Sequence, residues 1–164
     1  MEITTVLVDL STTLVYSFMG CDYKMDLLDN IAVLIHDAKL DIAMHMTKSL
    51  APYDITPEQA FIIVLLNERD GLSQGEIAFA LRKDKSSITR MIVSLETKGI
   101  MHRITNSYDR RYFKVSLTDK GKSLATNVIP CISGTIDVLE TGFSLEEMNE
   151  LRRLLIKMRD NMKK

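Results

Sequence analysis

Three capping boxes, each followed by an apolar run with helical spacing, constrain the fold of this chain more than any other feature. The boxes are Thr56-Pro57-Glu58-Gln59, Ser73-Gln74-Gly75-Glu76 and Ser144-Leu145-Glu146-Glu147. In each box the hydroxyl accepts a hydrogen bond from an otherwise unpaired backbone N–H, and the Gln or Glu three residues later bonds back to the N-cap backbone. The boxes therefore predict helices over about 57–68, 74–81 and 145–162.

The N-terminal third of the chain contains another helical pattern. Apolar residues at steps of three and four between positions 25 and 50, with no proline or glycine among them, predict one long helix. Residues 1–24 are ambiguous, because their apolar residues fit both a helix and short strands. We favour a helix there.

Two further helices are predicted from their ends. Asp84 begins one helix, and Gly99 ends it in the position where helices commonly end on glycine. A second helix opens at Thr118-Asp119 and reaches about Glu140. Pro130 lies inside it and predicts a kink, because proline removes a backbone donor and crowds the preceding turn.

The segment between these two helices has the pattern of a β-hairpin. Residues 100–105 and 111–117 flank the turn-rich stretch 106–110. Phe113, Val115 and Leu117 alternate with Tyr112, Lys114 and Ser116, which predicts a strand with one buried face and one face toward solvent. The expected fold is therefore mainly α with a small β-hairpin.

The charge of the chain is unevenly distributed. The length of 164 residues corresponds to one domain, and a net charge of −1 by itself argues against a nucleic-acid binder. However, residues 82–114 contain nine basic and three acidic side chains, a net charge of +6, whereas residues 1–81 have a net charge of −8. A solvated surface would explain the basic segment equally well on charge alone.

The order of the elements favours DNA binding. A short helix, a brief turn, a second helix and a hairpin form a helix-turn-helix with a wing, whose second helix enters the major groove. The residues exposed in the first turns of that helix, which we expect to contact DNA, are Lys85, Ser86, Ser87, Thr89 and Arg90. We expect contacts to the phosphate backbone from Ser73, Gln74, Lys83, Lys98 and Arg103. An arginine at the hairpin tip would suit the narrow, negative minor groove.

Other chemistry is not indicated. Cys21 and Cys131 lie too far apart to suggest a disulfide framework or a metal site, and we interpret them as ordinary thiols of a reducing compartment. No nucleophile–base pair, phosphate loop or carboxylate pair stands out, so we expect no enzyme, no metal and no cofactor. The acidic Glu2 and the short apolar stretches predict neither a secretory signal nor a membrane span, hence a cytoplasmic protein.

Five motifs between residues 53 and 121 resemble the multiple antibiotic resistance regulator (MarR) family of winged-helix repressors. They are Asp54-Ile55-Thr56-Pro57-Glu58-Gln59, Leu72-Ser73-Gln74-Gly75-Glu76-Ile77-Ala78, the segment from Ser87 to Ile100, Asp109-Arg110-Arg111, and Leu117-Thr118-Asp119-Lys120-Gly121. Each is weak alone, but five in the right order are specific. The resemblance covers most of the chain in element order.

The resemblance implies a homodimer on a pseudo-palindromic DNA operator. A winged helix-turn-helix domain at 53–118 would lie between an N-terminal dimerisation region at 1–52 and C-terminal dimerisation helices at 119–164. In the wing, Asp109 would hold Arg111 so that it reaches the minor groove, and Arg110 would contact phosphate. An ordinary solvated ion pair at the turn is the alternative.

The resemblance also implies a response to small molecules. Family members bind aromatic acids or other amphipathic compounds in a cleft between the dimer helices and the winged domain. Residues here that could line such a cleft are His36, Lys39, His45, Met46 and Tyr53. Each could equally be an ordinary core or interface residue.

The sequence thus predicts a sequence-specific, double-stranded DNA-binding regulator, a repressor released by a small aromatic or amphipathic ligand. Two alternatives remain. One is a helical protein-interaction module whose winged helix does not bind DNA. The other is a thiol-based redox regulator on the same fold, although neither Cys21 nor Cys131 clearly matches the cysteine of oxidant-sensing relatives.

Overall fold

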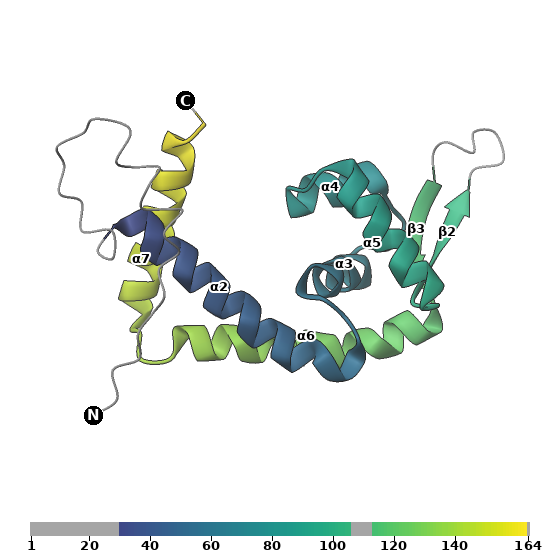
Figure 1. The fold of residues 1–164 in the computed structure, drawn as a ribbon, viewed down its shortest axis with the longest axis horizontal. Helices are drawn as coiled ribbons and strands as arrows, with labels where there is room; N and C mark the ends of the chain where they lie inside the picture. The colour runs from purple at the N-terminus through teal and green to yellow at the C-terminus, as the bar shows by residue number, and fades with distance from the viewer. Residues whose placement is uncertain (1–29, 106–112, 164) are drawn as a thin grey trace, which may run out of the picture. The chain divides into compact units, whose positions relative to one another are not determined.

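The computed structural model describes residues 30–105 and 113–163 (Figure 1). The elements in chain order are α2 (Ile31–Leu50), η2 (Ala51–Tyr53), α3 (Pro57–Glu68), β1 (Leu72–Ser73), α4 (Gln74–Leu81), α5 (Lys85–Thr97), β2 (Met101–Thr105), β3 (Phe113–Leu117), α6 (Asp119–Glu140) and α7 (Leu145–Asn161). The mainly α fold with a small hairpin is confirmed. The expected helix within residues 1–24 lies outside the described residues. The chain divides into two compact units, Met1–Ala38 and Lys39–Lys164.

All three capping boxes form as predicted. The hydroxyl of Thr56 accepts from the backbone N–H of Gln59 at 3.3 Å, and the side chain of Gln59 bonds back to the N-cap. Ser73 and Ser144 cap α4 and α7 in the same way, each at 3.2 Å. Because capping is local, the sequence located these three helix starts without knowledge of the packing.

A single apolar core supports the helix-turn-helix. Its members come from α2 to α6 and from all three strands, and α3 lies between α6 and the α4–α5 pair (Figure 1). The largest fully buried side chains are Leu50, Ile62, Ile63, Leu66, Ile77, Ile88, Ile92, Leu95, Val115 and Val128. Each such burial stabilises the fold by roughly 1.5–3 kcal/mol. This core fixes the direction of α5.

Close packing ties α6 to the start of the hairpin. A Cβ added at Gly121 would lie 2.0 Å from the backbone oxygen of Ile100, so only glycine fits there. The hydroxyl of Thr118 caps α6 and also donates to the backbone oxygens of Gly99 and Ile100. Helix α6 continues without a break through Pro130. The kink predicted at this proline stays a prediction.

The sheet differs from the sequence prediction in two respects. It has three antiparallel strands in the order β1-β3-β2, and the two-residue strand β1, in which Leu72 pairs with Val115, was not expected. The prediction that Ser116 faces solvent was wrong, because only 3% of its surface is exposed. Val115, Ser116 and Leu117 are buried in succession, so both faces of this end of the central strand are covered.

The last two helices meet at 102°. In the described part of the chain, no single helix is long and apolar enough to cross a membrane, although α6 and α7 taken together pass that test as a bent pair. No residue of α7 is buried, and its leucines and isoleucine are 41–73% exposed. The expected apolar face of α7 is therefore not buried by the residues that the structure describes.

Candidate nucleic-acid interface

The N-terminus of α5 is held by Asp84. Its carboxylate accepts hydrogen bonds from the Ser86 hydroxyl at 2.5 Å and from the Ser87 backbone and hydroxyl at 2.8 and 2.7 Å. These bonds, that from Ser86 foremost, hold the pKa of Asp84 well below its ordinary value of 3.8. The charged carboxylate also lies at the positive end of the helix dipole. The start of α5 is thus fixed in place.

A side chain from α4 secures the next turn of α5. The Gln74 amide donates to the backbone oxygen of Lys85 at 2.7 Å and to the Thr89 hydroxyl. The Thr89 hydroxyl in turn donates to the same oxygen of Lys85 at 2.8 Å. Both side chains that were expected to contact DNA therefore also connect the two helices of the helix-turn-helix.

The outward side of α5 follows from helix geometry. Ile88, Ile92 and Leu95 are fully buried, and a turn of 100° per residue places Ser86, Arg90, Val93 and Thr97 on the opposite side. Of the five residues predicted to contact DNA, Lys85, Ser86 and Arg90 are exposed, whereas Ser87 and Thr89 are half-buried. The Arg90 guanidinium donates to the Ser87 hydroxyl at 3.2 Å.

Sequence analysis missed Val93 on this outward side. Its side chain is 47% exposed, although valine offers nothing to solvent. The signal was present in the sequence, because Val93 follows Arg90 by three positions and precedes Thr97 by four, the spacing that keeps residues on one helical face.

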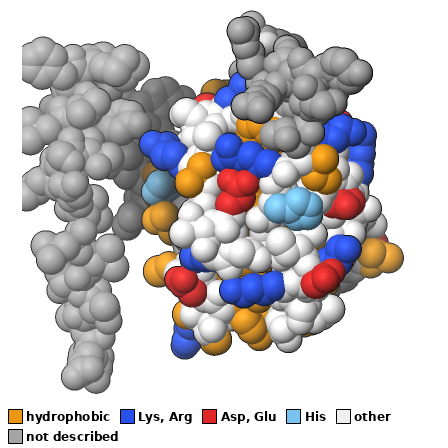
Figure 2. Space-filling view, turned by 90° about the vertical axis from the view of Figure 1, so that its right-hand side faces the viewer, with side chains coloured by type: hydrophobic (Ala, Val, Ile, Leu, Met, Phe, Trp, Pro, Cys, Tyr) orange, Lys and Arg blue, Asp and Glu red, His pale blue; other side chains and the backbone are white. Residues whose placement is uncertain are grey.

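The three basic residues expected to contact the DNA backbone have acidic partners within the fold. Lys83 pairs with Glu58 at 3.4 Å, Lys98 with Asp54 at 2.8 Å, and Arg103 with Glu96 at 2.9 Å. The Arg103 guanidinium also lies 4.5 Å from the centre of the Phe113 ring. These pairs agree with Figure 2, in which Lys and Arg side chains alternate with Asp and Glu on the face shown.

Two expected DNA contacts remain, namely Ser73 and the wing. The Ser73 hydroxyl caps α4 and donates to Glu76 at 2.8 Å. Hydrogen bonds from the Ser73 backbone N–H and then from this hydroxyl lower the pKa of Glu76. The wing residues Asp109, Arg110 and Arg111 lie outside the described residues. The last described pair of the hairpin is Thr105 with Phe113, next to the wing.

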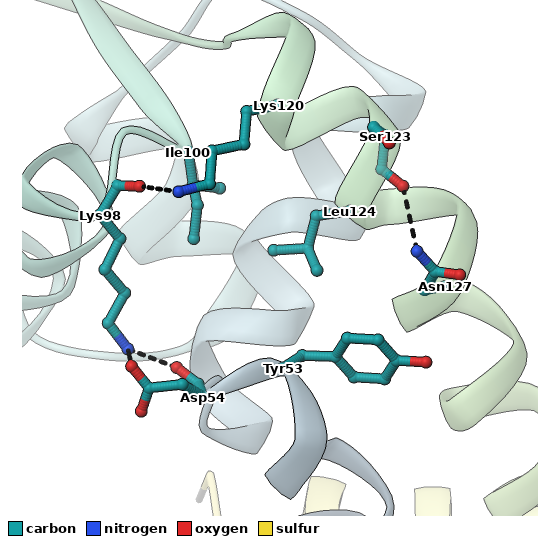
Figure 3. Close-up of a pocket in the computed structure, with 8 residues that line it drawn as sticks. All are labelled: Tyr53, Asp54, Lys98, Ile100, Lys120, Ser123, Leu124 and Asn127. Atoms are coloured by element: carbon teal, nitrogen blue, oxygen red, sulfur yellow. Dashed lines mark hydrogen bonds and ion pairs between the residues drawn. The ribbon is translucent and has the colours of Figure 1, made fainter.

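Among the described residues, no single hollow contains all five residues predicted to line one ligand cleft, although His45 and Tyr53 together line one of about 420 Å³. Met46 belongs to the core, and with Lys39 it borders an apolar hollow of about 270 Å³. The His45 ring nitrogen Nδ1 lies 3.2 Å from the Thr135 hydroxyl. Tyr53 lines a separate hollow of about 460 Å³ (Figure 3). His36 lies in α2, within the first compact unit.

The hollow of about 460 Å³ at Tyr53 lies beside the C-terminal end of α5. Lys98 directly follows α5, and Lys120 from α6 donates to its backbone oxygen at 2.7 Å. In Figure 3, Leu124 lies between the Lys98–Asp54 pair and the α6 residues Ser123 and Asn127. The hollow thus combines apolar groups, two ammonium groups and the carboxylate of Asp54, which is paired with Lys98.

Cysteine and metal chemistry find little support in the described part of the chain. The half-buried Cys131 has its Sγ 3.6 Å from the backbone oxygen of Ser49, and Cys21 lies outside the described residues. Within residues 30–105 and 113–163, no three His, Cys, Asp or Glu side chains are grouped as a metal ion would need.

The helix-turn-helix lies in the part of the chain that is similar to a known protein family. Residues 55–113 match the MarR family. The chain is 26% identical over 139 residues to the HTH-type transcriptional regulator BilQ of Clostridioides difficile, covering 85% of this chain and 94% of BilQ. This part of the chain matches the MarR family. Its members are transcription regulators that bind DNA through a winged helix.

Two further comparisons support this assignment. The chain is 32% identical over 95 residues to the HTH-type transcriptional repressor MdtR of Bacillus subtilis, covering 58% of this chain and 61% of MdtR. Its fold is similar to the crystal structure of the S. aureus MepR–DNA complex, with a TM-score of 0.76 and 25% identity. That match covers 80% of this chain and 98% of the MepR chain.

Proposed function

We propose that this protein is a homodimeric, MarR-type repressor that reads a pseudo-palindromic operator with α5 and its wing. The observation that carries the proposal is the fixed α5: Asp84 and Gln74 hold its first turns, and Arg90 stands on its outward side. A recognition helix must be held rigidly, because a small misplacement would separate donors from base edges.

Within this proposal the α5 residues have different roles. Ser86 and Arg90 contact bases, since arginine pairs with guanine O6 and N7 and a small hydroxyl permits close approach. Lys85 meets phosphate. Ser87 and Thr89 face the groove edge while their hydroxyls keep α5 in place.

Further proposed contacts, to the minor groove and to phosphates, position α5 on the DNA. Arg111, held by Asp109, reaches the minor groove, and Arg110 binds phosphate. Contacts to the DNA phosphates also come from Ser73, Gln74, Lys83, Lys98 and Arg103. Exchange of an exposed acidic partner such as Asp54 for a phosphate costs little, because surface ion pairs contribute only about 0–1 kcal/mol.

The exposed apolar side chains of α6 and α7 support the homodimer. Large exposed apolar surfaces mark interaction sites, and closed symmetric dimers are the commonest oligomers. The large exposed apolar residues of these helices are Ile136, Val138, Leu139, Leu145, Leu151, Leu154, Leu155 and Ile156. In this proposal, regions 1–52 and 119–164 form the dimer and region 53–118 binds DNA, in the cytoplasm and without enzymatic activity.

The effector is proposed to bind the hollow at Tyr53. Its size of about 460 Å³ suits a small molecule, and its lysines suit a carboxylate with an apolar body. Benzoate is expected to release DNA more effectively than neutral benzamide. Lys120→Gln should reduce that difference, whereas Lys122→Gln, an exposed control on α6, should not. Equal release by both compounds would place the effector elsewhere.

The function is tested by selecting duplexes from a random library with the purified protein. The expected result is a two-fold related consensus with half-sites about one helical turn apart. Binding should fall steeply with salt, because about 0.9 counterions leave for each neutralised phosphate. No enrichment, or binding insensitive to salt, would favour the interaction-module alternative.

A further inference from the structure

The outward side of α5 has one apolar member that the fold does not use. Ser86 and Arg90 are polar neighbours on this side, whereas Val93 makes no contribution to the core and is 47% exposed. Its removal would cost the fold little. An exposed valine on a helix that enters DNA needs a partner outside the protein to become buried.

The position of Val93 along α5 keeps it within reach of the groove. It follows Lys85 by eight residues, about 12 Å along the axis, and the major groove is about 12 Å wide. Val93 lies one turn beyond Arg90, on the same side. A helix that brings Arg90 to base edges therefore brings Val93 to the neighbouring base pairs or to the groove wall.

The chemistry of the base edges singles out one partner. In the major groove every base offers polar groups, and only thymine adds a methyl group. Valine has no donor or acceptor, and its β-branch leaves one strongly preferred rotamer in a helix. It therefore presents a rigid apolar surface without loss of side-chain freedom on binding.

We propose that Val93 is a specificity-determining residue that selects thymine, through its C5 methyl group, in each operator half-site. The inference rests on the proposed DNA reading by α5 and assigns one base preference to it. Arg90 would select guanine by hydrogen bonds, and Val93 would select thymine by apolar contact. One helical face thus combines two kinds of recognition.

The test removes only the methyl group. An operator is first selected from a random library with the wild-type protein, and each thymine is then replaced singly by deoxyuridine. Affinities are measured by fluorescence anisotropy for the wild type and for Val93→Ala. At one thymine per half-site, the wild type is expected to lose about fourfold in affinity, the effect of about 0.8 kcal/mol for one buried carbon. Val93→Ala should lose almost nothing there.

Ile104→Ala is the matched control. Ile104 is an aliphatic residue of β2 that is 49% exposed, so its truncation removes similar apolar surface away from α5. It should retain the full effect of deoxyuridine. Equal losses for wild type and Val93→Ala at every thymine, or half-sites that contain no thymine, would overturn the inference. A protein that selects no operator at all would instead refute the proposed function.

Discussion

Helices α5 and α7 are both amphipathic, but among the described residues only α5 has a buried apolar side. Ile88, Ile92 and Leu95 on the apolar side of α5 are completely buried. On α7 no residue is buried, and Leu145 at its start is 73% exposed. The described residues thus pack the apolar side of α5 but leave that of α7 partly exposed. This difference motivates the proposal that a second copy of the chain packs against α7.

The largest expected effect comes from the packed side of α5. Ile92→Ala removes fully buried methyl groups and should reduce the free energy of unfolding by about 2–5 kcal/mol. Denaturant unfolding followed by circular dichroism measures this loss. Val93→Ala, one residue away on the outward side, should change stability by less than about 0.5 kcal/mol. Similar losses for the two variants would contradict the assigned orientation of α5.

On α7 an apolar substitution should act on assembly instead. Leu155→Asp places a charge on the exposed apolar face and is expected to weaken dimerisation at least about 100-fold, or 2.8 kcal/mol. Sedimentation velocity over a dilution series measures this change. Lys157→Asp introduces the same side chain on the polar side and should leave a dimer. A Leu155→Asp protein that remains dimeric at all concentrations would exclude this face from the interface.

DNA affinity should depend on α5 and the wing. Arg90→Ala is expected to lower operator affinity by about 5- to 150-fold and to relax the preference at one base pair. Arg111→Ala should weaken binding severely without unfolding the dimer. Arg159→Ala, which removes an exposed arginine from the last turn of α7, is the control. Gel-shift affinities that do not change in Arg90→Ala would remove that residue from base contact.

The smallest effect concerns the N-cap of α5. The pKa of Asp84 is lowered in the folded state, so its contribution to stability is present above about pH 4 and declines as pH falls. Asp84→Asn keeps an acceptor but does not titrate. Thermal unfolding between pH 5 and 2 should therefore show a steeper loss for the wild type than for Asp84→Asn. Parallel curves would contradict the role of the charge.

Local signals were the predictable part of this molecule. Capping by Thr56, Ser73 and Ser144 depends on residues three positions apart, and all three helix starts were found. Strand β1 was missed because two residues give no pattern, and its existence depends on pairing with Val115 far along the chain. Alternation failed at Ser116 because the central strand is covered on both faces.

The site was predicted less completely than the fold. The segment of α5 was located by its charge and order, but the acidic partners of Lys98 and Arg103 were not predicted. Asp54, the partner of Lys98, lies 44 positions earlier in the chain, and no sequence spacing indicates such a pair. Val93 was missed because attention to charge and hydroxyls passes over an apolar residue, although helical spacing places it beside Arg90.

The stoichiometry of the protein–operator complex tests the central claim most directly. A selected duplex carrying one consensus is mixed with the full chain, and the complex is weighed by native mass spectrometry. The account predicts two chains per duplex at all ratios, and Leu155→Asp should lose this tight two-chain complex. One chain per duplex, bound as tightly in Leu155→Asp as in the wild type, would contradict the claim that DNA reading by α5 requires the dimer.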